Sequence, residues 1–478
     1  LANCNEGTAQ VEGKSILGIF GLGFLGGLFA LIMPCIFPMI PLTVNFFNKS
    51  SKSKAVGIRR AGLYGFFILL IYLLLSLPFH LIEGVDAGIL YDIASSVWLN
   101  LFFFVIFLFF AGSFFGYYEL TLPASWSNRA SRGENTGGIV GIFFMALTLA
   151  LVSFSCTGPI LGSLLVGAVS EGAWPLTAGM AGFGLALALP FTLFAAFPQW
   201  LQSLPSSGGW LNSVKVVLGF VEIALALKFL SNADLVGEWD WLKIEYFYIV
   251  WILCCVGIAA YLFKLIRFPH DSKNRKIGLT SIGVALASLA FGAYLITGFQ
   301  KDPELGSYQP LGFISGFPPP VCYSAWNPCD CPQGIPCFKD LDEGLAYACE
   351  VGKPIMLDFT GYSCVNCRRM EENVWSQPRI RNILSNDYVL ISLYVDDQSA
   401  LPVDQQQKVP RIDRPESTFL INKVGKKWQY LQQSVYAKNS QPYYALISPN
   451  GQTLNPPVAY TPDVVDKSLA RSGETLHT

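Results

Sequence analysis

The sequence carries little charge for its length. Only 14% of its 478 residues are Asp, Glu, Lys or Arg, whereas 52% are hydrophobic. Soluble globular proteins have about 25% charged residues, so this composition excludes a chain that is soluble throughout. The apolar residues are concentrated in residues 1–300, which we interpret as a membrane region.

The sequence also lacks a long basic tract, a nucleotide-binding glycine loop and a dense cysteine framework. With a formal net charge of −1, nothing indicates nucleic-acid binding. The twelve cysteines are too scattered for a disulfide scaffold but numerous for a cytosolic enzyme. This leaves redox chemistry, metal binding or local disulfides as their roles.

Apolar segments long enough to cross about 30 Å of hydrocarbon as helices occur eight times. Lys and Arg gather after the first, third and seventh segments, whereas loops after even-numbered segments carry mainly Asp and Glu. By the positive-inside rule, both ends of the bundle face away from the cytoplasm. The predicted spans are residues 16–47, 61–82, 97–118, 137–169, 175–197, 213–230, 245–266 and 278–298.

Four parts follow from this pattern: an extracytoplasmic remnant (1–14), a membrane domain (15–299), a Pro- and Cys-rich connector (300–340) and a soluble domain (341–478). Because the chain starts at Leu1 with a polar lead, we expect a signal peptide or a whole domain to be missing upstream. The connector is expected to be an extended spacer. In the soluble part we expect helices near 340–350, from Cys364 and near 462–471, and strands at PIMLDF, 388–395 and YYALIS, with a hairpin turn at Asn450-Gly451. This order predicts an α/β fold with a mixed sheet.

Two Cys-x-x-Pro motifs interrupt membrane helices. Cys35 lies three residues before Pro38 in MPCIFPMIPLT, and Cys156 three before Pro159 in SFSCTGPILG. Proline breaks the helix in both places, and broken helix within a membrane lines a cavity or is buried in protein. Spans one to three and four to six therefore resemble an inverted repeat, in which Cys35 and Cys156 face each other as a dithiol–disulfide pair. The alternative is that both cysteines are small apolar fillers.

Other polar groups in the predicted spans have less context. Glu222 lies in the middle of the sixth span, where an ionisable side chain is a functional candidate that assists thiol deprotonation or lines the cavity. Lys228 is interpreted as a snorkelling residue near the end of this span. Cys254 and Cys255 lack a broken-helix context and are interpreted as structural.

The soluble domain contains a Cys-x-x-Cys motif, Cys364 and Cys367, directly after a predicted strand and at the start of a helix. Unpaired N–H groups at a helix start stabilise a thiolate. We therefore predict Cys364 as the nucleophile and Cys367 as the resolving thiol. A zinc knuckle is the main alternative, but it needs a second pair of ligands at suitable spacing.

Three further residues are candidates near this motif. Asp358 ends the strand before Cys364, and Glu371 follows Cys367 by one helical turn, so carboxylates there would raise the thiol pKa and relay protons. The alternative is a strand-end Asp and a solvated helix Glu. Pro442 precedes YYALIS, where a cis-proline commonly borders a dithiol site, although the sequence does not reveal the isomer.

The connector region holds several cysteines whose simplest role is to form local disulfides on the oxidising side of the membrane. Their number is odd, so one stays free or pairs elsewhere, for example with Cys4, and the pairing is not deducible from sequence. They are Cys322, Cys329, Cys331, Cys337 and Cys349.

Taken together, MPCIFPMIPLT, SFSCTGPILG, VKVVLGFVEIALALKFLSN and DFTGYSCVNC, in that order, resemble the DsbD family of transmembrane thiol:disulfide interchange proteins across nearly the whole chain. The resemblance implies an eight-span module that takes electrons from cytoplasmic thioredoxin and hands them to a periplasmic thioredoxin-like domain. It assigns Cys35 and Cys156 to the membrane pair, Cys364 and Cys367 to the outer pair, and Asp358 and Glu371 to the nearby acids. In that family an N-terminal immunoglobulin-like domain passes electrons to disulfide isomerases and cytochrome c maturation. That domain is absent from this sequence, so either the chain is a fragment or another protein receives the electrons.

The resulting hypothesis is a protein-disulfide reductase of the bacterial inner membrane, with both termini in the periplasm. Electrons come from NADPH indirectly, through thioredoxin, and no bound haem, flavin or metal is required. The partners are membrane lipid, thioredoxin and periplasmic thiol–disulfide proteins. Two alternatives remain open: a membrane transporter with an attached redox or chaperone domain, and a quinone-linked thiol oxidase that runs electrons inward.

Overall fold

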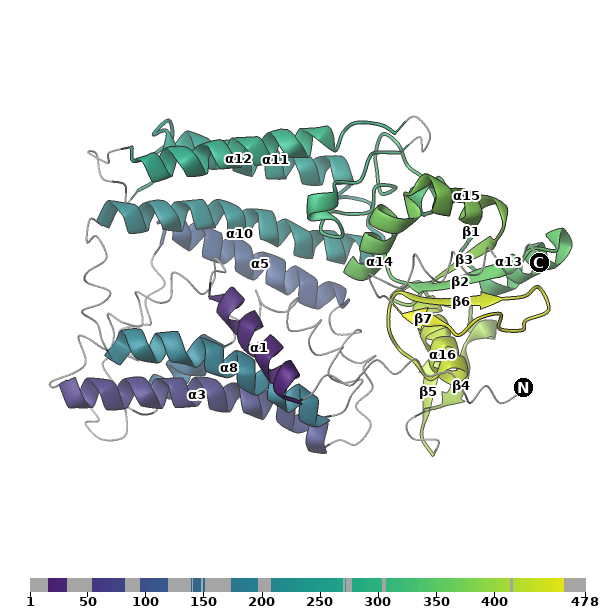
Figure 1. Ribbon diagram of the computed structural model, residues 1–478, viewed down its shortest axis with the longest axis horizontal. Coiled ribbons are helices and arrows are strands. Elements are labelled where there is room, and N and C mark those ends of the chain that lie inside the picture. The colour runs from purple at the N-terminus through teal and green to yellow at the C-terminus, as the bar shows by residue number, and fades with distance from the viewer. Residues whose placement is uncertain are drawn as a thin grey trace.

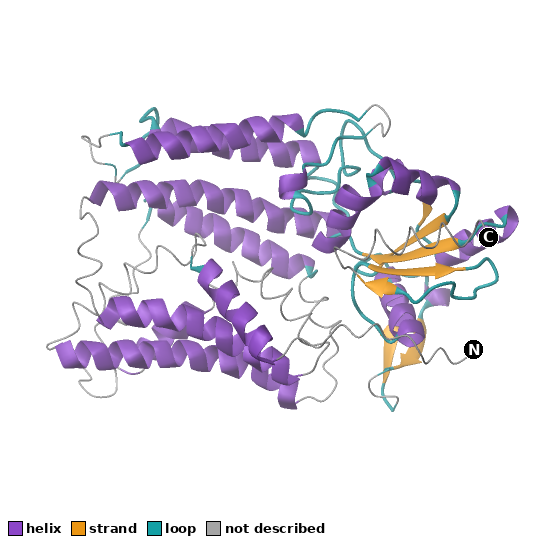
Figure 2. Ribbon diagram, in the orientation of Figure 1, coloured by secondary structure: helices purple, strands orange, loops and turns teal. Residues whose placement is uncertain are grey.

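The computed structural model describes residues 16–31, 54–81, 95–118, 139, 141–147, 149–150, 173–196, 208–269, 271, 277–302, 307–412 and 416–459. The predicted membrane pair, Cys35 and Cys156, lies outside these residues, as do Pro38 and Pro159. Cys4 and the helix predicted near 462–471 also lie outside them. Helices fill the N-terminal region, and the described strands gather at one end of the molecule (Figure 2).

The first group of helices consists of α1 (Ile16–Ala30), α3 (Lys54–Leu81) and α8 (Ala173–Ala196) (Figure 1). α8 packs against both others, and Tyr64, Ile68 and Phe183 are buried between them. Glycines let α1 and α8 approach closely, because a Cβ on Gly23 would lie only 2.2 Å from the carbonyl oxygen of Gly179. Small residues at such crossings are typical of helices that pack within a membrane.

The second group consists of α5 (Val97–Phe114), α10 (Gly208–Gly237), α11 (Ile244–Leu262) and α12 (Leu279–Thr297). α10 packs against α5 and α11, and α11 against α12 (Figure 1). By length and mean hydropathy, four described helices are able to cross a membrane: residues 58–77, 97–114, 244–262 and 279–297. The predicted count of eight spans therefore stays a prediction.

Contacts between the two halves pair equivalent members of the predicted repeat. The second predicted span, α3, packs on the fifth, α8, and the third, α5, packs on the sixth, α10. Half of the first span and most of the fourth lie outside the described residues, so the repeat itself stays a prediction.

The connector is not the extended spacer that its proline content predicts. Tyr308, Leu311 and Val321 are buried against Tyr248 and Trp251 of α11, because the aromatic residues among the prolines join the apolar cluster at the outer end of the second helix group. Two short turns, η1 (Gly312–Ile314) and η2 (Pro332–Gly334), lie within this segment.

Carboxylates at the helix ends also hold the connector. Glu245, at the start of α11, accepts hydrogen bonds from the backbone N–H groups of Ala325 and Trp326 and from the hydroxyl of Ser324. Asp234, near the end of α10, accepts one from the hydroxyl of Tyr323 at 2.7 Å. These bonds fix the connector to the bundle.

The soluble domain is built on a five-stranded sheet in the order β1-β3-β2-β6-β7. β1, β3 and β2 are parallel, whereas β6 is antiparallel to β2 and to β7. The strands are β1 (Cys337–Phe338), β2 (Ile355–Thr360), β3 (Val389–Tyr394), β6 (Tyr443–Ile447) and β7 (Val458–Ala459).

Helices cover both faces of this sheet. Ile355, Leu357 and Phe359 face the layer formed by α13 (Leu341–Val351) and α16 (Val424–Tyr436). Met356 faces the opposite layer, formed by α14 (Val365–Met370), the π-helical turn η3 (Glu371–Trp375) and α15 (Pro378–Asn386). Because side chains alternate along a strand, Asp358 and Thr360 also point toward α14.

The predicted fold class, a helical membrane region followed by a thioredoxin-like α/β domain, is confirmed. The strands and helices expected between 341 and 447 are present, and Gly451 takes φ of 79° in the expected turn. The two-residue strand β1 within the predicted connector was not expected, and neither was the separate helix α15. The ladder of β4 (Gln407–Pro410) and β5 (Thr418–Ile421), which follows the short turn η4 (Val403–Gln405), was also not expected.

Candidate functional site: a dithiol centre over buried carboxyl groups

Cys364 and Cys367 form a disulfide at the point where β2 leads into α14. Their Cα atoms are 5.3 Å apart. Cys364 is the N-cap of α14, and its Sγ accepts a hydrogen bond from the N–H of Cys367 at 3.1 Å. Cys364 is 7% exposed and Cys367 only 1%, so Cys364 is the sulfur that a partner protein reaches more easily.

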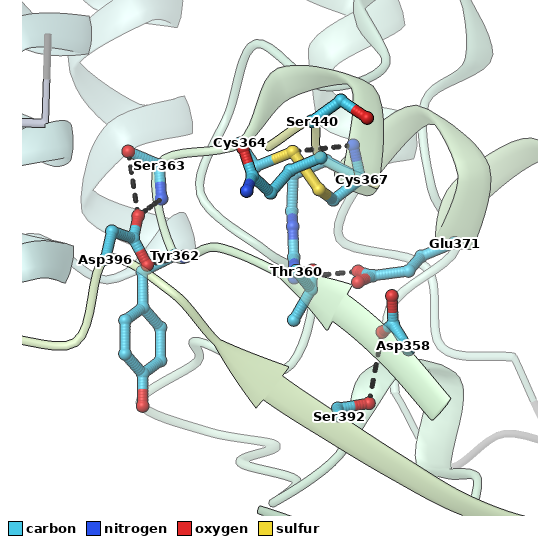
Figure 3. Close-up of a disulfide and its surroundings, with 12 residues drawn as sticks. Asp358, Thr360, Tyr362, Ser363, Cys364, Cys367, Glu371, Ser392, Asp396 and Ser440 are labelled. Carbon is cyan, nitrogen blue, oxygen red and sulfur yellow. Dashed lines mark hydrogen bonds and ion pairs between the residues drawn. A yellow bond between two sulfur atoms is a disulfide. The ribbon is translucent and has the colours of Figure 1, made fainter. Parts of the chain in front are cut away.

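Asp396 holds the loop that precedes Cys364. Its carboxylate accepts hydrogen bonds from the N–H of Tyr362 at 2.7 Å and from the N–H and hydroxyl of Ser363, both at 2.9 Å (Figure 3). The ring of Tyr362 stacks on that of Tyr394 at the end of β3, with centroids 4.1 Å apart. Asp396 was not predicted from the sequence, although its position just after β3, a strand parallel to β2, was the available signal.

Asp358 lies under the disulfide on the face of β2 that α14 covers. It is 1% exposed and accepts a hydrogen bond from the Ser392 hydroxyl at 3.2 Å (Figure 3). Burial raises the pKa of Asp358 to about 7, opposed by the Ser392 hydrogen bond and the nearby charge of Arg368. This carboxyl group therefore titrates near neutral pH.

Glu371 approaches the same space from the helix side, and Figure 3 shows its carboxyl group beside that of Asp358. Its Oε2 lies 2.7 Å from Nη1 of Arg368, and both side chains are buried. Burial raises the pKa of Glu371 to about 8 against the opposing charge of Arg368, and the charge of Asp358 adds to the increase. Arg368 was missed, because a basic residue after a Cys-x-x-Cys motif looks like a solvated helix residue.

The connector contacts this helix directly. Glu372 Oε2 accepts a hydrogen bond from the N–H of Gly316 at 3.0 Å. Gly316 has φ of 76°, and a Cβ there would lie 2.7 Å from the carbonyl oxygen of Val365, so glycine permits this approach. The Asn373 amide donates to the Ser315 hydroxyl at 3.0 Å. The turn after α14, which carries Glu372 and Asn373, is thus packed against the connector.

Pro442 follows a cis peptide bond from Gln441, immediately before β6. Ser440, two residues earlier, lies in the surroundings of the disulfide (Figure 3). The segment before the cis-proline therefore borders the dithiol, the place expected for it.

The membrane candidates are only partly described. Glu222 is fully buried within α10, and its neighbours Val221 and Ile223 pack in the apolar cluster of the second helix group. Its relation to Cys35 and Cys156 lies outside the described residues. Cys254 and Cys255 are buried in α11 without a disulfide partner among the described residues.

Four connector cysteines are paired as local disulfides, Cys322 with Cys329 and Cys331 with Cys337. The remaining one, Cys349, is an exposed thiol on α13 with no disulfide partner among the described residues. Since Cys329, Cys331 and Cys337 are in disulfides, they do not supply the second ligand pair that a zinc knuckle would need.

A mixed five-stranded sheet with a Cys-x-x-Cys disulfide at the start of the helix after a central strand defines the C-terminal unit as a thioredoxin-like disulfide oxidoreductase domain. Comparison with family models agrees: residues 337–412 match a thioredoxin-like family. Residues 16–233 match the cytochrome C biogenesis protein transmembrane domain. With its apolar helices, the chain is therefore a membrane protein of the bacterial inner membrane, and the resemblance found in the sequence is confirmed.

Relatives that match most of the chain are named thiol:disulfide interchange proteins DsbD. The chain is 28% identical to that of Vibrio vulnificus (strain YJ016) over 404 residues, which are 80% of this chain and 60% of the relative. It is 27% identical to DsbD 2 of Pseudomonas aeruginosa over 430 residues, 86% of this chain and 66% of the relative. The chain spans about 60% of the length of the first of these relatives.

Proposed function

We propose that this protein is a protein-disulfide reductase that carries electrons from cytoplasmic thioredoxin across the membrane to the Cys364–Cys367 pair, and from there to periplasmic acceptors. The acceptors proposed are disulfide isomerases and cytochrome c maturation proteins, reached directly or through an immunoglobulin-like domain. The electrons originate from NADPH through thioredoxin, and no bound cofactor takes part. Both termini face the periplasm in this proposal.

One observation carries the proposal: a disulfide-forming Cys-x-x-Cys pair, backed by buried carboxyl groups, is joined in one chain to a cytochrome c biogenesis type membrane domain. The membrane domain supplies a route across the bilayer, and the thioredoxin-like domain supplies an exchangeable dithiol. The names of the relatives agree with this chemistry.

The outer reaction is an exchange in which atoms and electrons balance. The Cys364 thiolate attacks one sulfur of the acceptor disulfide, a mixed disulfide forms, and the first acceptor thiolate leaves. Cys367 then loses its proton and attacks the Cys364 sulfur, which re-forms the Cys364–Cys367 disulfide and releases the second acceptor thiolate. The acceptor has gained two electrons and, after protonation, two protons.

Buried acids suit the proton transfers of this reaction. Burial brings the pKa of Asp358 to about 7 and that of Glu371 to about 8, close to working pH. Glu371 lies one helical turn after Cys367. Glu371 accepts the Cys367 proton, and Asp358 disfavours the thiolate until the acceptor is bound.

The membrane half of the relay is proposed from sequence. Thioredoxin reduces a Cys35–Cys156 disulfide from the cytoplasmic side, and the resulting dithiol reduces Cys364–Cys367 from the other side. Pro38 and Pro159 keep these segments unwound, which gives a docking thiol access, and Glu222 lines the path between the halves.

The test is the redox state of Cys364 and Cys367 in growing cells, read by trapping free thiols with a mass-adding maleimide. In the full-length protein we expect a dithiol when thioredoxin is present and a disulfide when it is depleted or when Cys35 is changed to Ala. Cys156→Ala is expected to leave the pair oxidised as well, because Cys35 alone cannot form the membrane disulfide that thioredoxin reduces. Cys254→Ala is the matched control and leaves the pair reduced.

The opposite outcome overturns the proposal: a pair that stays reduced without thioredoxin, or in the Cys35→Ala protein, takes its electrons elsewhere. Cys367→Ala extends the test, because it leaves the mixed disulfide of Cys364 unresolved. The trapped acceptor is then identified by mass spectrometry.

A further inference from the structure

The connector and the dithiol helix border a half-open cavity of about 120 Å³. Its walls come from the connector, from Leu235 at the outer end of α10, and from the thioredoxin-like domain. A polar cavity of this size has room for several water molecules. The charged residues of the lining are Asp330, Lys339, Arg368, Glu371 and Glu372.

Gln333 contributes to this cavity from the turn η2. It is 1% exposed, and its backbone has φ of 56° and ψ of 22°. Residues with a Cβ seldom adopt this left-handed conformation, and they keep it where the surrounding structure imposes it. The side-chain oxygen of Gln333 has no hydrogen-bond partner among the described residues. A strained and buried amide with an unused acceptor is typical of a functional position.

The connector disulfides hold this turn in place. The Cys331–Cys337 disulfide closes the loop that carries Gln333, and the sulfur of Cys322 lies 3.1 Å from the carbonyl oxygen of Cys331. Ile335, in the same loop, is fully buried in the cluster that contains Met370 and Trp375. The turn is therefore fixed against the helical segment that carries Glu371.

The Arg368–Glu371 ion pair also lines this cavity. Arg368 Nε and Glu371 Oε1 also have no hydrogen-bond partner among the residues that the structure describes. Three residues of the cavity lining thus have a buried polar atom available to water. A lining of this kind suits a short hydrated path from Glu371 to the solvent.

We propose that Gln333, held on the loop closed by Cys331–Cys337, is a positioning residue that controls solvent access to the Arg368–Glu371 pair and thereby the release of the dithiol proton. The inference rests on the proposed function. When Cys367 is deprotonated, its proton passes to Glu371 and leaves through the cavity, while the electron pair of the sulfur forms the new bond to Cys364. The connector disulfides act as supports and carry no electrons.

Several charged or titratable groups surround Glu371, and their ionisation affects the pH dependence of reactions at the dithiol. Tyr323 and Tyr362 of the lining stay protonated in the range tested, because burial raises the pKa of both. The remaining groups are Asp358 on β2, Arg368 on α14, Glu372 on η3, Tyr394 on β3, and Asp330 and Lys339 of the connector.

The experiment is the pH profile of Cys364 alkylation by iodoacetamide in the full-length protein, purified in detergent and reduced with just enough dithiothreitol to open Cys364–Cys367, with mass spectrometry confirming that Cys331–Cys337 stays a disulfide. The Cys364 peptide is quantified by mass spectrometry. Gln333→Gly removes the amide and relieves the backbone strain. Water then reaches Glu371, which ionises at lower pH and disfavours the thiolate, so the midpoint moves up by about half a pH unit or more.

Gln333→Asn keeps an amide and tolerates the left-handed backbone, so its midpoint lies nearer to that of the wild type. The matched control is Gln405→Gly, at an exposed glutamine of η4, which leaves the profile unchanged. Hydrogen exchange of β2 verifies the fold, and Gln333→Ala replaces the glycine variant if that one loses protection.

A Gln333→Gly profile that superimposes on the wild type overturns the inference, as does an equal shift in the Gln405→Gly control. The measurement uses chemically reduced protein and needs no thioredoxin. It therefore fails or succeeds independently of the relay, which is tested by the redox state in cells.

Discussion

Arg368 and Glu371 form an ion pair in the interior of the thioredoxin-like domain, with Nη1 and Oε2 2.7 Å apart and each side chain 5% exposed. The pair lies between the dithiol and the connector. Two opposite charges in such a place cost desolvation energy and are retained together. The pair therefore couples the chemistry of the site to the stability of the domain.

Replacing one residue of this pair is expected to lower the free energy of unfolding more than replacing both. Arg368→Met leaves a buried carboxyl group that stays protonated, and we expect the free energy of unfolding to fall by about 2 kcal/mol. Arg368→Met combined with Glu371→Leu is expected to recover most of this loss. Hydrogen exchange of β2 and β3 amides measures the stability of the wild type, the two single variants and the double variant. If the effects of the two single substitutions simply add up in the double variant, the two residues do not interact.

The raised pKa of Asp358 predicts how the domain responds to pH. Burial moves this pKa from 3.8 to about 7, so between these values the folded state holds a proton that the unfolded state releases. Stability from this group is complete below about pH 4 and declines as pH rises to about 7, by up to about 1.4 kcal/mol per unit. In the Asp358→Asn protein, stability is expected to change less with pH between about pH 4 and pH 7.

Hydrogen exchange at pH 5, 6, 7 and 8, corrected for the intrinsic rate at each pH, checks this prediction. Asp342→Asn, at an exposed side chain of α13, is the control and keeps the wild-type slope. A wild-type stability that rises from pH 5 to pH 7 would contradict the raised pKa of Asp358.

Asp396 is expected to be essential for the loop before Cys364. Asp396→Ala removes three accepted hydrogen bonds, from the backbone of Tyr362 and Ser363 and from the Ser363 hydroxyl. Two half-buried N–H donors lose their partner, which costs about 2 kcal/mol. We expect faster exchange in residues 361–364, whereas Asp404→Ala, at an exposed residue, changes stability by less than about 0.5 kcal/mol. If residues 361–364 exchange equally fast in both variants, Asp396 does not hold this loop.

The Cys322–Cys329 disulfide is expected to stabilise the connector and to carry no electrons. It closes a loop of seven residues, for which chain entropy predicts about 2 kcal/mol. The Cys322→Ser, Cys329→Ser protein should be cleaved faster by protease in the connector but keep Cys364 and Cys367 reduced in cells. Loss of that reduction, with the domain still folded, would assign the connector disulfide to the relay.

Local patterns predicted the parts of the fold that depend on neighbours in sequence. The apolar run PIMLDF gave β2, and the cysteine spacing gave the start of α14. β1 is only two residues long and exists because Cys337 and Phe338 pair with β3, more than fifty residues later. Such a strand has no periodicity to detect.

The sequence predicted the site residues that lie within or close to the Cys-x-x-Cys motif. Cys364, Cys367, Asp358 and Glu371 lie together in the structure, as their spacing around one strand and one helix indicates. Arg368, Asp396 and Gln333 act through burial and through contacts made across the fold, and none has a distinctive sequence context. The connector was misjudged because its prolines hid the aromatic residues that join the helix bundle.

The most direct measurement is the redox state of Cys364 and Cys367 in cells that express the full-length protein with Cys35 intact or changed to Ala. Maleimide trapping is expected to find a dithiol in the first case and a disulfide in the second. A dithiol in both would contradict electron transfer through the membrane pair.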